Sequence, residues 1–100
     1  MIDGFPGDDG FVLIDFFADW CEPCKWVVPV IGDVQKNLNN QFKIEKSNID
    51  DHPEIAKAFH ILSVPTLILF HNKKEVWRMR GFDTVPNLTR EFEKIMSSIQ

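Results

Sequence analysis

The sequence predicts a single α/β domain in which helices cover both faces of a four-stranded mixed sheet. First, the chain has 100 residues, which is enough for one small domain that spans residues 1–100. Second, its hydrophobic fraction of 44% is that of a globular protein. Third, short apolar runs alternate with segments of helical period in the order β-α-β-α-β-β-α, which is typical of this fold class.

The first half of the chain predicts a β-α-β unit behind an irregular N-terminal arm. Residues 1–10 form that arm, because they are rich in glycine, aspartate and proline. Phe11–Phe17 is an apolar run typical of a strand buried on both faces. A helical period runs from Pro23 to the pair Asn39-Asn40, and Phe42–Ile49 then forms a second strand. A right-handed crossover makes the two strands parallel.

The second half predicts a short helix and then an antiparallel hairpin. Asp50–Pro53 is a turn whose proline suits the first position of a short helix. Thr66–Phe70 and Glu75–Arg80 are strands, and His71–Lys74 connects them tightly.

A final helix follows Gly81, which ends the last strand. Asp83 or Thr84 is suited to cap this helix, because a short polar side chain can accept a free backbone N–H. One face of the helix is apolar and consists of Leu88, Phe92, Ile95, Met96 and Ile99.

Charge and hydropathy exclude two classes of partner. The net charge of −4 argues against nucleic acid, because phosphate binding requires a cationic surface. No run of about 18 apolar residues is present, so we expect no membrane span. The first ten residues lack the features of a signal peptide, and the sequence therefore predicts a cytoplasmic protein. A signal peptide that had already been removed would not be visible in this sequence.

The two cysteines, Cys21 and Cys24, are placed for redox chemistry. They lie where the first strand passes into a helix, and unpaired N–H groups and the helix dipole stabilise a thiolate there. A spacing of three residues puts both sulfurs on one helix face, close enough for a disulfide. Cys21, nearer the exposed edge, should attack a substrate disulfide, and the deeper Cys24 should then release the substrate.

Three other uses of a cysteine pair compete with redox exchange. A zinc site needs two more ligands, and no second cysteine pair exists. An inert structural disulfide fits poorly with a position at a helix start. An iron–sulfur cluster would need cysteines from two chains. The three histidines, His52, His60 and His71, also lie outside the spacing that is usual for zinc ligands. The sequence therefore predicts neither a metal site nor a cofactor beyond the Cys21–Cys24 disulfide.

The segment around the cysteines, Trp20 to Lys25, reads W-C-E-P-C-K and resembles the active site of the thioredoxin family. The resemblance extends over about nine-tenths of the chain, from Phe11 to the final helix. It implies a thioredoxin-like fold and a protein-disulfide reductase that cycles between dithiol and disulfide. It also implies disulfide-containing protein substrates and an electron donor similar to thioredoxin reductase.

The resemblance further implies a set of residues that bind the substrate. Val64 and Pro65 resemble the family's loop that faces the cysteines, in which the proline bond is cis and the backbone pairs with the substrate. Gly81 resembles the loop that borders the groove, although it could simply end a strand. Trp20 resembles the indole beside the nucleophile, although core packing is its alternative. The expected substrate-binding residues are Trp20, Glu22, Pro23, Val64, Pro65 and Gly81.

Two charged residues match the family's proton relay. Asp15 interrupts an apolar strand, and burial there should raise its pKa so that it can accept the proton of Cys24. Solvation at a bend is the alternative for Asp15. Lys46 matches the lysine near that carboxylate, and a role at the surface is its alternative.

Two departures from the family pattern have consequences. Residues 1–10 are too short for the strand and helix that precede the first core strand in full-length thioredoxins, so the fold is near-minimal. The second strand can then be an open edge, and we expect a monomer or a weak dimer. Glu22 replaces the usual glycine, and its charge should disfavour the Cys21 thiolate and make the protein more reducing.

Two alternative functions remain open from the sequence. An oxidase or isomerase would use the same cysteines in the opposite direction, in an oxidising compartment. A groove-based protein-binding module would use the surface around Val64 and Pro65 without needing redox activity.

Overall fold

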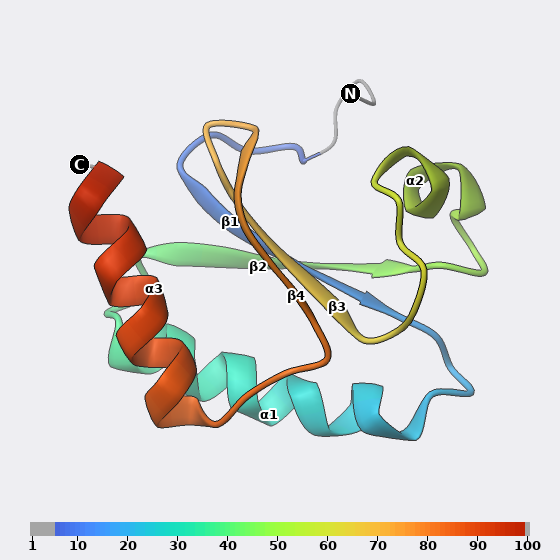
Figure 1. Ribbon diagram of the computed structural model, residues 1–100, viewed down its shortest axis with the longest axis horizontal. Coiled ribbons are helices and arrows are strands. Elements are labelled where there is room, and N and C mark those ends of the chain that lie inside the picture. The colour runs from blue at the N-terminus through green and yellow to red at the C-terminus, as the bar shows by residue number, and fades with distance from the viewer. Residues whose placement is uncertain (1–5, 100) are drawn as a thin grey trace.

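The computed structural model describes residues 6–99 and contains seven helices and strands in the expected order (Figure 1). Residues 1–5 of the predicted arm lie outside the described residues. The elements are β1 (Phe11–Phe17), α1 (Glu22–Asn37), β2 (Phe42–Asn48), α2 (Pro53–Ala58), β3 (Thr66–His71), β4 (Lys74–Arg80) and α3 (Val85–Ile99). The predicted fold class is therefore confirmed.

The sheet has the strand order β2-β1-β3-β4 and is mixed. β1 and β2 are parallel, with Phe11 opposite Phe42 and Phe17 opposite Asn48. β3 is antiparallel to both β1 and β4. β1 is thus an inner strand, and this position explains why its sequence is apolar on both faces.

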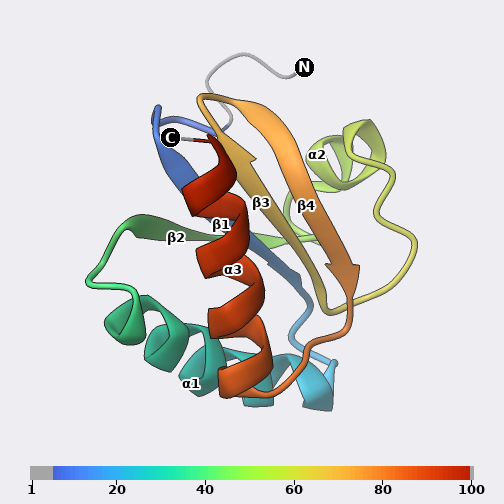
Figure 2. The same ribbon diagram turned by 60° about the vertical axis from the view of Figure 1, so that its left-hand side comes forward.

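The helices cover the sheet unequally, with α1 and α3 on one face and the short α2 on the other (Figure 2). Alternate residues of a strand point to opposite faces, and the core divides accordingly. Leu13 and Leu69 pack with Ile31 of α1 and Phe92 of α3. The α2 side of the sheet holds Val12, Ile14, Phe16, Ile68 and Phe70.

The ends of the elements show local chemistry that the sequence predicts in outline. Thr84 rather than Asp83 caps α3, because its Oγ1 accepts the N–H of Asn87 at 3.3 Å. The β3–β4 turn is only Asn72-Lys73, and both residues have positive φ, 48° and 69°. Within residues 6–99, no helix is long and apolar enough to cross a bilayer.

Candidate active site

Cys21 and Cys24 form a disulfide at the start of α1, with their Cα atoms 5.4 Å apart. Cys21 is the N-cap residue of α1, and its extended backbone ends the turn that follows β1. Its N–H donates to the carbonyl of Ala18 at 3.1 Å, which fixes that turn. The N–H of Cys24 donates to the Sγ of Cys21 at 3.2 Å. The helix start thus directs a free backbone donor at the first sulfur, as expected from its position.

The two cysteines do not differ in exposure, and the expectation that Cys21 is the more accessible one is wrong for this oxidised form. Cys21 is 5% exposed and Cys24 is 4% exposed. Both pack with Ala18, and Phe17, Ile49 and Val64 cover the cluster. The remaining difference is one of position, because Cys21 precedes the helix and Cys24 lies within its first turn.

Asp15 is fully buried, so the alternative of solvation at a bend is wrong. Within the described chain, neither of its carboxylate oxygens has a hydrogen-bond partner. Burial raises the pKa of Asp15 to about 6, and the positive charge of Lys46 partly opposes that increase. Asp15 belongs to the odd-numbered residues of β1, whose side chains point toward α1.

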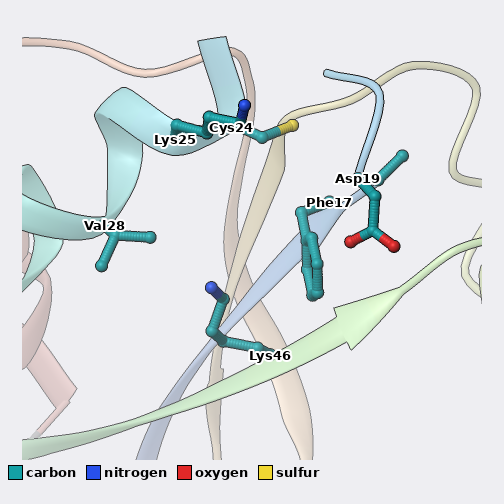
Figure 3. A pocket seen from close by; sticks show the side chains of 7 residues that line it. Phe17, Asp19, Cys24, Lys25, Val28 and Lys46 are labelled. Carbon is teal, nitrogen blue, oxygen red and sulfur yellow. The ribbon is translucent and has the colours of Figure 1, made fainter. Parts of the chain in front are cut away.

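Lys46 lies opposite Asp15 in the register of β1 and β2, and its side chain extends over a small pocket. Its Nζ is 4.6 Å from the centre of the Phe17 ring, a cation–π contact. Figure 3 shows the amine of Lys46 near this ring and beneath α1. The pocket has a volume of about 160 Å³ and is lined by Phe17, Ala18, Asp19, Cys24, Lys25, Val28 and Lys46.

This pocket joins Cys24 to the lysine, while Asp15 lies outside its lining. Lys46 is exposed, as the surface interpretation expects, yet its charge also acts on Asp15. The two alternatives for Lys46 are therefore compatible.

Val64 lies beside the cysteines, and Pro65, the next residue in the chain, is joined to Gly81. Val64 packs against the cysteine cluster, and the Val64–Pro65 bond is cis. The N–H of Gly81 donates to the carbonyl of Pro65 at 2.7 Å. Gly81 has a φ of 86°, which favours glycine, so it both follows β4 and joins the two loops. Leu62, just before this loop, is 76% exposed.

Trp20 is exposed by 68%, so core packing is the wrong alternative for it. Its Nε1 donates to Oδ2 of Asp50 at 2.9 Å. The Asp50 turn is itself fixed by Asn48, whose Oδ1 accepts the N–H groups of Asp50 and Asp51 at 2.9 and 3.3 Å. Sequence reasoning missed this network, although an asparagine two residues before a turn donor is a recognisable signal.

Glu22 is paired with Lys25, one helical turn away, at a distance of 3.0 Å between Oε1 and Nζ. Both side chains are largely exposed, so the pair is weak. Glu22 therefore places a negative charge next to Cys21, and the positive charge of Lys25 partly offsets it. Sequence reasoning missed the role of Lys25.

An α/β fold with a cysteine pair at a helix start, and a buried aspartate in the strand that leads to it, defines a protein that exchanges thiols and disulfides. Residues 6–94 match the model of the Thioredoxin family. A thioredoxin of Chlamydia caviae is 47% identical over 81 residues, which are 81% of this chain and 78% of that protein. The chain belongs to the thioredoxin family, and it is a thiol–disulfide oxidoreductase of the protein-disulfide reductase type.

Two further matches agree with this assignment. The solved structure of a mutant thioredoxin from Halobacterium salinarum NRC-1 is 32% identical, with a TM-score of 0.76, over 93% of this chain and 80% of that one. A bifunctional thioredoxin reductase/thioredoxin of Mycobacterium leprae is 36% identical over 88 residues, which are 88% of this chain but 19% of that protein.

Proposed function

We propose that Cys21 is the attacking cysteine and Cys24 the resolving one, in a cycle that reduces disulfides of protein substrates. The hydrogen bond from the Cys24 N–H to the Sγ of Cys21 carries this assignment. A donor aimed at one sulfur stabilises negative charge on that sulfur and on no other. The assignment thus rests on the helix start rather than on exposure.

The cycle has two exchange steps. The Cys21 thiolate attacks one sulfur of the substrate disulfide, and the other substrate sulfur leaves as a thiolate. Cys24 then loses its proton and attacks the Sγ of Cys21, which releases the second substrate thiolate and forms the Cys21–Cys24 disulfide. Two electrons pass from the protein to the substrate. A donor must return two electrons and two protons to restore the dithiol.

Asp15 is proposed to accept the proton of Cys24. A base works best when its pKa lies near the working pH, and a pKa of about 6 is closer to neutrality than that of an ordinary aspartate. Its carboxylate oxygens have no other partner in residues 6–99, so they are free to bind a proton. Lys46 is proposed to support this step by stabilising the ionised carboxylate beforehand, so that Asp15 is ready to accept the proton.

The substrate is proposed to lie as an extended segment across Val64. Within the described chain, no hydrogen bond engages the backbone of Val64, so it is available to pair with a substrate strand. Pro65 and Gly81 hold that loop, and the exposed residues Trp20, Glu22 and Pro23 are proposed to form the opposite rim. The exposed indole of Trp20 offers an apolar contact surface.

The electron donor is proposed to be similar to thioredoxin reductase. The Mycobacterium leprae relative supports this, since its name joins both activities in one chain. A reducing compartment such as the cytoplasm is the location that this direction requires. Equilibration with defined glutathione mixtures tests the direction, because an oxidase or isomerase would have a markedly higher reduction potential.

The cysteine roles are tested with single variants and a disulfide-bonded test protein. Cys24→Ser should trap a mixed disulfide through Cys21, whereas Cys21→Ser should be inactive and trap nothing. Ser63→Ala, a change near the site that leaves both cysteines in place, is the control for general damage. Trapping by Cys24 in the Cys21→Ser protein would reverse the assignment. Retained binding of the test protein by the double serine variant would favour a binding module instead.

A further inference from the structure

Asn48 is a buried polar residue at the end of β2, where that strand reaches the loops around the cysteines. It is 8% exposed and lies opposite Phe17, the last residue of β1, in the register of the sheet. A buried amide destabilises a fold unless its polar atoms have hydrogen-bond partners. Both polar atoms of the Asn48 amide have partners, and these come from two different loops.

The oxygen of this amide holds the loop that follows β2. Oδ1 of Asn48 accepts the N–H groups of Asp50 and Asp51, at 2.9 and 3.3 Å. The backbone carbonyl of Asn48 also accepts the N–H of His52 at 3.0 Å. Two backbone donors can only face an acceptor, so the amide oxygen must point to this loop and the amide nitrogen must point away from it. The turn after β2 is therefore built around one side chain.

The nitrogen of the amide reaches the loop that follows β1. Nδ2 of Asn48 donates to Oδ1 of Asp19 at 3.4 Å, which is long for a hydrogen bond and makes this the weakest contact of the amide. Figure 3 shows the carboxylate of Asp19 on the side of its loop that faces β2. The same loop carries Cys21, whose N–H donates to the carbonyl of Ala18 at 3.1 Å. Asn48 thus ties the turn that precedes α1 to β2.

Trp20 joins the same two loops a second time, at their exposed rim. Its Nε1 donates to Oδ2 of Asp50 at 2.9 Å, and Trp20 follows Asp19 in the chain. The contact at the rim depends on the one at the base, because the backbone of Asp50 is held by Asn48. The indole is 68% exposed, so packing restrains it little and its orientation is set by this ring of hydrogen bonds.

We propose that Asn48 is a positioning residue for substrate binding, which holds Asp50 and the loop of Asp19 so that the indole of Trp20 is ordered before a protein substrate arrives. A side chain that is already ordered loses less conformational entropy on binding, and the affinity is higher for that reason. This role rests on the proposed binding of substrate at Trp20. Asn48 acts through Trp20, so its loss should weaken binding and leave the exchange chemistry of the cysteines unchanged.

Steady-state reduction of a disulfide-bonded test protein by Asn48→Ala measures this role. KM should rise by about threefold to tenfold, because the loosened indole must be ordered during binding, while kcat stays within about twofold. Reduction of hydroxyethyl disulfide, which is too small to reach from the cysteines across the rim, should be unchanged. Asn37→Ala is the matched control and should not alter KM, since the Asn37 amide joins α1 to α3 by a bond of 3.2 Å to Oγ1 of Thr89.

An exchange of the two side chains at the base tests the contact itself. In Asn48→Asp the new carboxylate still accepts the N–H groups of Asp50 and Asp51, but it opposes the carboxylate of Asp19, so KM should rise by about threefold. Adding Asp19→Asn restores a donor and an acceptor in reversed order, and KM should return to within about twofold of the wild-type value. Both positions remain polar throughout, so this series is informative even where Asn48→Ala unfolds.

NMR relaxation of the Trp20 indole reports its ordering directly. The order parameter of its Nε1–H group should fall from about 0.85, typical of rigid groups, to below about 0.6 in Asn48→Ala. The indole of Trp77 is the internal control, because its Nε1 donates to Oε1 of Glu91 at 2.8 Å and should stay equally rigid. Trp20→Phe identifies the signal, since it removes that N–H group.

Trp20→Ala separates this role from the proposed binding of substrate at Trp20. An unchanged KM in Trp20→Ala would overturn both. A raised KM in Trp20→Ala, together with an unchanged KM in the Asn48 variants, would overturn the positioning role alone. An indole that stays rigid in Asn48→Ala would also overturn it, as would an equal loss of activity toward the test protein and hydroxyethyl disulfide. Failure of Asp19→Asn to lower the KM of Asn48→Asp would exclude the contact at the base.

Discussion

Asp15 of β1 lies opposite Lys46 of β2, and this pair places a buried carboxyl and an exposed amine on the face of the sheet that carries α1. Burial removes the Asp15 carboxyl from water and raises its pKa, and the positive charge of Lys46 offsets only part of that increase. The two residues therefore have separable effects on stability and on the pH dependence of the reaction.

Asp15→Asn should stabilise the protein at pH 7 and change its stability little at pH 4. The folded pKa of about 6 exceeds the ordinary value of 3.8, so the folded state binds more protons between these values. Stability of the wild type then falls as the pH rises from about 4 to 6, by about 3 kcal/mol in all. Urea unfolding of both proteins at pH 4 and 7 measures this difference. Equal stability differences at the two pH values would contradict a buried, titrating Asp15.

Lys46→Met should move the pH dependence of the resolving step to higher pH. Lys46 lowers the pKa of Asp15, so its removal raises that pKa and delays ionisation of the carboxyl. The measurement is the release of substrate from the mixed disulfide with Cys21, followed from about pH 5 to 9 so that it spans neutrality. Lys43→Met is the matched control, because it removes a lysine from the same strand at a side chain that points to the other face. A shift of equal size in both variants would argue against a specific effect of Lys46.

Glu22→Gly should raise the reduction potential by about 30 mV or less, and Glu22→Gln should do the same. Removing the carboxylate stabilises the Cys21 thiolate and therefore the reduced form. The effect is small because Glu22 is exposed and paired with Lys25. Lys25→Met should lower the potential, since it leaves the Glu22 charge unopposed. Equilibration with glutathione mixtures gives the potentials of the wild type and the three variants, and an unchanged or lower value for Glu22→Gln would refute this electrostatic explanation.

Gly81→Ala should destabilise the protein by about 1 kcal/mol through backbone strain alone. The φ of Gly81 is 86°, whereas an added Cβ would meet no atom within 4 Å. Gly32→Ala in α1 is the matched control, because it also has open space but a helical backbone. It should stabilise the protein by up to about 1 kcal/mol. Thermal unfolding of both variants tests the opposite signs.

The fold could be predicted from the sequence because its main signals are local. The apolar run of β1, the helical period after Pro23 and the turn residues each specify one element. Seven elements in this order allow few topologies. The observed sheet follows because β-α-β crossovers are right-handed and strands joined by a tight turn pair as an antiparallel hairpin. The cysteine pair was found in the same way, from its place at the junction of two elements.

Side-chain contacts between distant or exposed residues could not be predicted in this way. The bond of Trp20 to Asp50 and the pairing of Glu22 with Lys25 depend on rotamers, which periodicity does not encode. The equal burial of Cys21 and Cys24 depends on how Val64 covers them, and that loop joins the site only through the tertiary fold. Family resemblance, rather than spacing, brought Val64 into the predicted site.

The position of β1 inside the sheet has a consequence for how this protein can diverge. The strand that holds Asp15 and leads into the cysteine turn is also the one on which both neighbouring strands assemble. Changes there would damage scaffold and chemistry together. Leu62, Trp20 and Glu22 are exposed, so replacing them disturbs little packing. Changes at these exposed residues can therefore alter which protein substrates bind, while the reaction centre stays the same.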